Sequence, residues 1–292
     1  MGAELATRLI DEATSSSPAN PRAPRAGRRR GGGGPRRRAV DWLARLAGIA
    51  AVLLVLEICS RTGVLPRESF PPVSEIYGSL LGLVTDTPFW IEVGRTMRGW
   101  AVGLLVAVVL AVPLGMLLGA SRRAFEMSRL IIEFLRPVPS VALIPLAVLV
   151  FGVGQDMKVF LVAFACFWPI LFQSIYGVQD VDPVATDTAR SYGLPLLARF
   201  TRITLPSAAP YIATGLRISS AIALILALTA ELVVGAPGLG RAIVVSQISG
   251  SITQMYALIL ATGLLGWGLN TVFLAVERRL LRWHPSHREV AL

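Results

Sequence analysis

Apolar residues in this chain are gathered in long blocks that short, charged segments separate. Each block holds about 17–25 residues, the length at which a helix that rises ~1.5 Å per residue crosses about 30 Å of hydrocarbon. The blocks cover about Trp42–Cys59, Arg98–Gly119, Leu130–Val153, Met157–Val178, Pro210–Val234 and Met255–Val276. The pattern predicts an all-α integral membrane protein with about six transmembrane helices.

Composition agrees with a membrane protein and changes the meaning of the charge. Hydrophobic residues make up 54% of the chain and charged residues 16%, whereas a soluble domain carries about 25% charged residues. The net charge of +10 would suggest a nucleic-acid partner in a soluble protein, but much of it lies within residues 1–38. That segment holds too few apolar residues to fold alone. We expect a disordered basic tail over 1–40, weak contact with anionic membrane lipid, and no nucleic acid.

The distribution of arginine predicts the orientation of the chain. Arginine is concentrated in the tail before the first block, in the loops after the second and fourth blocks, and in the segment after the sixth. Positive charge marks the cytoplasmic side of a membrane protein. With an even number of spans these four segments share one side, so both termini are expected in the cytoplasm.

A polar but patterned loop, residues 179–209, follows the fourth block. Asp182 before Pro183 is typical of a helix start, and Gly193 before Pro195 of a helix stop, so the pattern predicts a short helix over 183–192. A second amphipathic stretch, with apolar residues at helical spacing, is expected to end before Pro206. Its apolar positions are Leu197, Phe200 and Ile203.

This loop resembles the cytoplasmic loop of bacterial ABC importer permeases, whose pattern is E-A-A, three residues, G, nine residues, I-x-L-P. Asp187-Thr188-Ala189 occupies the E-A-A positions, Gly193 follows after three residues, and Ile203-Thr204-Leu205-Pro206 follows after nine more. The spacing is complete, although Asp187 replaces Glu and Thr188 replaces the first Ala. The resemblance implies a coupling loop, between spans four and five, whose short helix docks on an ATPase subunit. Its expected residues are Asp187, Ala189, Gly193, Ile203, Leu205 and Pro206.

Two further motifs resemble the nitrate, sulfonate and taurine branch of these permeases. Arg136-Pro137-Val138-Pro139, with Ile144-Pro145 beyond it, is similar to the third span of that branch, and Glu231 with Gly238-Leu239-Gly240 is similar to the end of its fifth span. The likeness covers about residues 90–277. It implies ATP-driven import of a small anion across the bacterial plasma (inner) membrane. The implied partners are ABC ATPase subunits, an extracytoplasmic substrate-binding protein and a second permease copy in a homodimer.

The chain lacks the residues for ATP hydrolysis or other catalysis. A phosphate-binding loop needs G-x-x-x-x-G-K-[ST], and the only lysine of the sequence is Lys158, in Gln-Asp-Met-Lys. The two histidines, His284 and His287, lie in the C-terminal segment, so no Ser-His-Asp or Cys-His set is available. Cys59 and Cys166 fall in apolar blocks and are interpreted as packing residues. We expect no catalytic residue, cofactor or metal in this polypeptide.

Two other functions are weighed against import by an ABC system. An ion-coupled secondary transporter needs ionisable groups near the bilayer midplane, and the candidates, Glu57 and Glu231, lie toward the outer ends of their blocks. A membrane-anchored scaffold is disfavoured by prolines within the spans, because broken helices line moving or wet regions. Glu231 itself has two interpretations, a gate or pathway residue near the outer mouth and an interfacial carboxylate.

These expectations divide the chain into four parts. Residues 1–40 form the basic cytoplasmic tail, and 41–89 hold the first transmembrane helix and an external segment. Residues 90–277 form the transmembrane core of the permease, and 278–292 form a C-terminal cytoplasmic tail.

Overall fold

The computed structural model describes residues 35–280 of the chain. Residues 1–34 of the expected N-terminal tail, and residues 281–292 with His284 and His287, lie outside this range. The chain divides after Leu54 into two units. In the first unit a helix already begins at Pro35, inside the range expected for the tail, and it continues across the division to Arg61.

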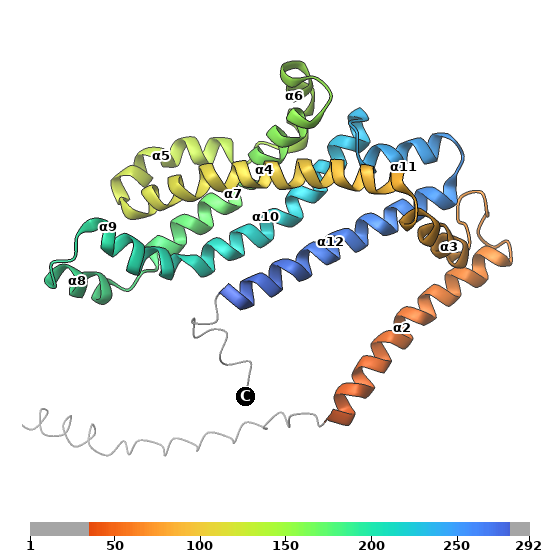
Figure 1. The fold of residues 1–292 in the computed structure, drawn as a ribbon, viewed down its shortest axis with the longest axis horizontal. Coiled ribbons are helices and arrows are strands. Elements are labelled where there is room, and N and C mark those ends of the chain that lie inside the picture. Colours follow the sequence, from red (N-terminus) through yellow and green to blue (C-terminus); the bar gives the residue numbers. More distant parts are fainter. Residues whose placement is uncertain (1–34, 281–292) are drawn as a thin grey trace, which may run out of the picture. The chain divides into compact units, whose positions relative to one another are not determined.

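Every regular element in residues 35–280 is helical (Figure 1). The elements are α2 (Pro35–Arg61), α3 (Val73–Val84), α4 (Thr87–Ala120), α5 (Arg122–Leu135), the 3₁₀ helix η1 (Ser140–Leu143), α6 (Ile144–Phe151), α7 (Gln155–Gln179), α8 (Pro183–Ser191), α9 (Leu196–Arg199), the π-helix η2 (Phe200–Thr204), α10 (Leu205–Val234), α11 (Leu239–Ile248) and α12 (Ile252–Leu280). The all-α expectation is confirmed.

Four helical segments of the described chain are long and apolar enough to cross a membrane: Thr87–Ala120, Gln155–Gln179, Leu196–Ile248 and Ile252–Arg279. A fifth candidate is the pair Arg122–Leu135 and Ser140–Phe151, bent by 76°. The expected third span is therefore a broken helix, because Pro137 and Pro139 lack the N–H groups that would continue it. The expected first span falls within α2 and is not among these candidates.

The second stretch of the loop after α7 differs from its prediction. It was expected to end before Pro206, but α9, η2 and α10 follow one another without a gap. The ring nitrogen of Pro206 has no N–H to give to the preceding turn, yet the helical winding continues past it into α10. The wider π turn lies directly before that point, where the helix changes its winding.

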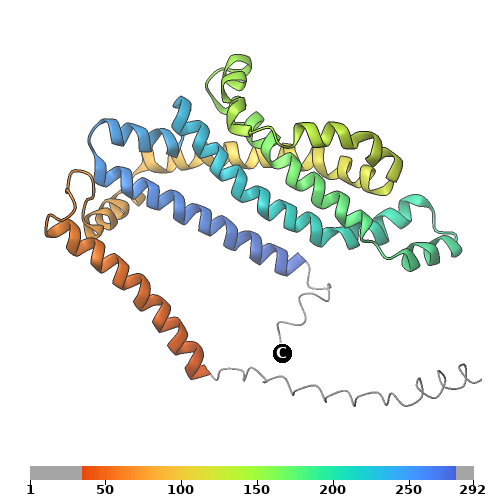
Figure 2. The ribbon, with the colours of Figure 1, turned by 180° about the vertical axis from the view of Figure 1, so that it is seen from behind.

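The core of the second unit is the packing of α4, α7 and α10, which run alongside one another (Figures 1 and 2). On α4 a small residue recurs every fourth position and faces α7: Gly99, Gly103, Ala107, Ala111, Gly115 and Gly119. A Cβ added at Gly103 would lie 2.6 Å from the Val162 side chain, and one at Gly115 would lie 2.8 Å from the Leu171 carbonyl oxygen. Small residues at this spacing let two membrane helices approach to backbone contact.

The remaining helices complete the two ends of this core. Near the start of α4, helices α3, α11 and α12 close a smaller apolar cluster around Phe89, Leu239 and Leu258. Figures 1 and 2 show α8 and α9 at the opposite end from α3 and α11. The helix α6 projects away from the long helices (Figure 1).

The contact between α4 and α7 predicts a contrast between two glycines of one helix. Gly115→Ala places a methyl group against the backbone of α7, so we expect a loss of about 1–3 kcal/mol of stability. Gly94→Ala, with no atom within 4 Å of its added Cβ, should change stability by less than about 0.5 kcal/mol. Thermal unfolding of the two variants in detergent compares them, and equal midpoints would contradict the packing described here.

Candidate functional site

The loop between α7 and α10 has the geometry that its sequence pattern predicts at both ends of its short helix. The Val184 N–H donates to Asp182 Oδ1 at 2.8 Å, so Asp182 is the N-cap of α8. At the other end Gly193 has φ of +71°, a conformation that L side chains rarely adopt. A Cβ added there would meet no atom within 4 Å. Glycine is therefore required at position 193 by the positive φ of the turn, and not by crowding within this chain.

The base of the loop is fastened to the helices on either side. The Tyr211 hydroxyl donates to Asp180 Oδ2 at 2.7 Å, which joins the end of α7 to the first turns of α10. Beside it, Gly177 lies against Ala208 so closely that an added Cβ would be 3.0 Å from the Ala208 Cα. The end of α7 and the start of α10 are therefore held together at the base of the loop.

The surface of the loop carries apolar side chains that nothing in the described chain covers. Val184, Tyr192, Leu196 and Leu197 are all exposed, each by 70% or more. The expected loop residues lie around them: Ala189 is buried, Asp187 is exposed and forms an ion pair with Arg190 at 3.5 Å, and Leu205 and Pro206 begin α10. Ile203 lies in the π turn. An exposed apolar patch of this kind is typical of a protein contact.

A second polar site is buried at the other end of the core, around Glu231. Its side chain and that of Lys158 are both fully buried, and Lys158 Nζ lies 2.8 Å from Glu231 Oε1. The Thr96 hydroxyl and the Gly240 N–H each donate to Glu231 Oε2 at 2.9 Å. A buried carboxylate needs such partners because water cannot reach it.

Lys158 also joins this site to the backbone around it. Its ammonium donates to the carbonyl oxygens of Pro237 at 2.8 Å and Arg95 at 3.3 Å, so all three of its protons find acceptors. The cluster thereby ties α4, α7 and α10 to the turn that precedes α11. Two glycines at the start of α11 leave room for it: a Cβ at Gly238 would overlap the Glu231 carboxyl group, and one at Gly240 would lie 2.7 Å from the Glu231 Cβ.

These contacts correct the interpretation of Glu231 as an interfacial carboxylate, since its side chain has no exposed surface. They also give Glu231 a buried partner that the sequence pattern did not predict. Lys158 stood out in the sequence only as the single lysine that rules out a phosphate-binding loop, whereas it is buried in the first turn of α7. A single lysine at the start of an apolar block, with one glutamate near the end of another, was the available signal.

A third feature is a pocket of about 440 Å³ at the break between α5 and η1. Arg136 follows the end of α5 and Ser140 begins η1. The lining also includes Trp168 and Gln173 from α7, and Ile218 and Ile222 from α10. The Arg136 guanidinium carbon lies 4.6 Å from the centroid of the Phe172 ring. In the sequence Arg136 stands out only as part of the Arg-Pro-Val-Pro motif, and no pattern brings Trp168 or Gln173 into a site.

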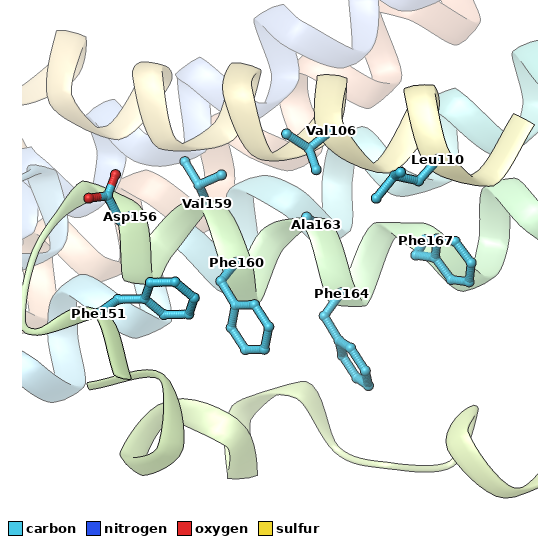
Figure 3. Close-up of a pocket in the computed structure, with 9 residues that line it drawn as sticks. All are labelled: Val106, Leu110, Phe151, Asp156, Val159, Phe160, Ala163, Phe164 and Phe167. Atoms are coloured by element: carbon cyan, nitrogen blue, oxygen red, sulfur yellow. The ribbon is translucent and has the colours of Figure 1, made fainter. Parts of the chain in front are cut away.

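Another pocket, drawn in Figure 3, is apolar. Four phenylalanines line it, with Val106 and Leu110 from α4 and Asp156 at its edge. The phenylalanines are Phe151, Phe160, Phe164 and Phe167. Phe151 and Phe160 contact each other, with ring centroids 5.3 Å apart. In a membrane protein an apolar surface of this kind suits acyl chains or another transmembrane helix, so it gives no polar binding site.

Comparison with known proteins gives consistent relatives. The family model described as "binding-protein-dependent transport system inner membrane component" matches residues 111–283. The nitrate import permease protein NrtB of Leptolyngbya laminosa is 30% identical over 200 residues, which cover 68% of this chain and 72% of that protein. The taurine transport system permease protein TauC of Escherichia coli is 30% identical over 243 residues, or 81% and 88% of the two chains.

A more distant relative and a solved structure agree with these. A putative aliphatic sulfonates transport permease protein, SsuC of Bacillus subtilis, is 25% identical over 253 residues and covers 87% of this chain and 92% of that one. The inward-facing MetNI methionine ABC transporter contains a chain with a TM-score of 0.56 at 17% identity, covering 68% of this chain and 98% of that one. At that identity the match concerns the fold.

The buried ion pair predicts strong coupling between its two partners. Lys158→Met leaves an unpaired buried carboxylate and Glu231→Gln an unpaired buried ammonium, so each should cost about 3–5 kcal/mol. The double variant removes both charges and should recover much of that loss. A double-mutant cycle by thermal unfolding measures the coupling. If the two single losses simply add in the double variant, the pair does not stabilise the fold as described.

Proposed function

The chain belongs to the family of inner membrane components of binding-protein-dependent transport systems, and from that premise we propose that it imports a small anion. It is a multi-pass inner membrane permease of an ABC importer, and it is not the ATPase of that system. The partners of such a system are an ATPase and a binding protein. We propose how this chain docks on these partners, which substrate it transports and how it is oriented in the membrane.

The observation that supports the coupling proposal is the exposed end of the loop between α7 and α10. Its motif spacing is complete, its helix α8 is capped at both ends, and its apolar side chains are uncovered. In our proposal α8 docks on the ATPase, with Ala189 and Gly193 near the contact. Asp187 faces the partner, and Ile203, Leu205 and Pro206 connect the loop to α10. The ties at Asp180–Tyr211 then pass the movement to the core as a rigid body.

The proposed substrate is a nitrate, a sulfonate or taurine. The relatives named for nitrate, taurine and aliphatic sulfonate transport are permeases of similar length and align over most of this chain. All three named substrates carry an oxoanion group. The binding protein is expected to set the final selectivity, and two permease copies are proposed to form the pathway between them.

The proposed topology is six spans with both termini in the cytoplasm. The segment of α2 over Trp42–Cys59 is the added span, and the bent pair α5–α6 is the third. Residues 1–40 and 278–292 are then cytoplasmic tails, 41–89 hold the first span and an external segment, and 90–277 form the permease core. The positions of arginine along the sequence support this arrangement.

An ion-coupled mechanism is the alternative, and the two glutamates proposed for it are already engaged. Glu231 is bound to Lys158, Thr96 and Gly240. Glu57 accepts from the Ser74 N–H at 3.0 Å, at the start of α3, and pairs with Arg61 at 2.6 Å. A carboxylate at a helix N-terminus, paired with arginine, is a structural arrangement.

ATP-driven uptake tests the proposed function directly. Proteoliposomes holding the permease, its ATPase and its binding protein are loaded with ATP and given labelled nitrate, taurine or ethanesulfonate. Accumulation of at least one anion that needs both ATP and the binding protein is the expected result. Uptake that instead follows an imposed ion gradient without ATP would contradict the proposal.

The topology predicts which engineered cysteines are reached from each side of the membrane. In a chain with Cys59 and Cys166 replaced by serine, cysteines at Ser121, Ser191 and Ser286 should react only from the cytoplasmic side. Cysteines at Ser69 and Ser249 should react only from outside. An impermeant maleimide applied to intact cells and to inverted vesicles makes the measurement. Labelling of Ser191→Cys from outside would rule out this orientation.

The docking of α8 predicts different effects for two glycines that share one backbone conformation. Gly193 and Gly250 have φ of +71° and +74°, and an added Cβ meets nothing within 4 Å at either. Gly193→Glu should insert and accumulate normally but lose ATPase association and uptake by tenfold or more, a loss of roughly 1.4 kcal/mol of binding. Gly250→Glu carries the same backbone strain at the opposite end and should keep ATPase association.

Pull-down of the ATPase from detergent extracts compares the two variants at equal expression. Equal retention of the ATPase by Gly193→Glu and the unchanged protein would remove the loop from the docking surface. Equal loss in both variants would assign the effect to strain and not to docking.

A further inference from the structure

The pocket beside Arg136 brings together hydrogen-bond donors that have no acceptor in the described chain. The Trp168 Nε1–H is shielded from solvent and has no hydrogen-bond partner among the described residues. The guanidinium of Arg136 lies over the Phe172 ring and, in the described chain, pairs with no carboxylate. No acidic side chain lines the pocket. A cavity with one positive charge and free donors suits an anion.

The pocket, with its unpaired arginine, lies some way along α7 from the end of that helix. Phe172 precedes the end of α7 by seven residues, which is about 10 Å along the helix at ~1.5 Å per residue. Trp168 lies one turn deeper. A charged side chain within a span is rare, and it faces a partner, a bundle interior or a water-filled cavity. Arg136 is exposed in the described chain, so at this depth its guanidinium needs water or an anion beside it.

The backbone around the pocket supports the same conclusion. The chain leaves helical structure between α5 and η1, and irregular backbone at membrane depth is tolerated where it lines a cavity. On the facing helix, Pro169 lacks the N–H that would bond the carbonyl of Ala165, and both residues line the pocket. Water in the pocket can satisfy that carbonyl.

From these contacts we infer that the Arg136 pocket is an anion-binding station on the import pathway. Its ligand is a small oxoanion of the nitrate or sulfonate kind. The flat guanidinium can donate two parallel N–H bonds to two oxygens of such a group, and the Trp168 N–H can donate a third. This inference rests on the proposed import of anions and assigns that role to particular residues.

The test measures transport by the assembled system in proteoliposomes, normalised to the amount of permease–ATPase complex. The probes are nitrate, taurine and ethanesulfonate, each with a binding protein that delivers it. Arg136→Gln removes the charge and should lower uptake by roughly tenfold to a hundredfold, the loss expected for one charge-assisted hydrogen bond. Arg136→Lys keeps the charge and should retain part of the uptake. Trp168→Phe keeps the ring without its N–H and should lower uptake severalfold.

Arg123→Gln is the matched control. Arg123 is exposed on α5 and does not line the pocket, so its loss changes the net charge equally and should leave uptake unchanged. If the wild type transports an anion and both Arg136→Gln and Trp168→Phe keep full uptake, the anion-binding station is contradicted while the proposed import function stands. A wild type that transports no anion with ATP would instead overturn the proposed function.

A lipid phosphate has the same chemistry as the proposed ligand, so two membrane compositions separate them. In liposomes of phosphatidylcholine alone, the effect of Arg136→Gln should persist. If the effect appears only when phosphatidylglycerol is added, Arg136 binds a lipid headgroup, and the inference that it binds the transported anion is wrong. If Arg136→Lys is as impaired as Arg136→Gln while Trp168→Phe is unimpaired, the residue has a structural role and the inference also fails.

Discussion

The close approach of α4 and α7 positions the other parts of the second unit. Six small residues at four-residue spacing bring the two backbones into contact, and membrane helices without a hydrophobic driving force between them rely on such packing. Because α10 also packs on α4 and α7, the three helices form a single bundle. The loop between α7 and α10 lies at one end of that bundle, and the turn before α11 lies at the other end.

The buried pair of Lys158 and Glu231 stabilises the end of this bundle that lies away from α8. Two charges without access to water stabilise a fold only when hydrogen bonds satisfy them fully, and here Thr96, Gly240 and two backbone carbonyls do so. At the opposite end, Asp180 and Tyr211 join α7 to α10. The helices α7 and α10 are therefore held together at both ends.

The sequence predicted the parts of the fold that depend on local chemistry. Block length indicated the helices, and Asp182 and Gly193 placed both ends of α8 to within a residue because caps are local signals. It could not predict the partner of Glu231, since Lys158 is 73 residues away and only packing brings the two together. The small-residue spacing on α4 was visible in the sequence, but the helix that it faces was not. The break at Pro137 was recognised as a motif, and its pocket depends on α7 and α10.

In the proposed import mechanism, the end of the molecule that carries α8 meets the ATPase and the end that carries α11 does not. A photo-crosslinking phenylalanine analogue can be placed at Tyr192 beside α8 and at Ile248 in α11, two side chains with the same exposure of 81%. Irradiation of the assembled transporter should join the ATPase to the chain labelled at Tyr192 and not to the chain labelled at Ile248. Crosslinking of the ATPase from Ile248, or none from Tyr192 in an intact complex, would contradict the account.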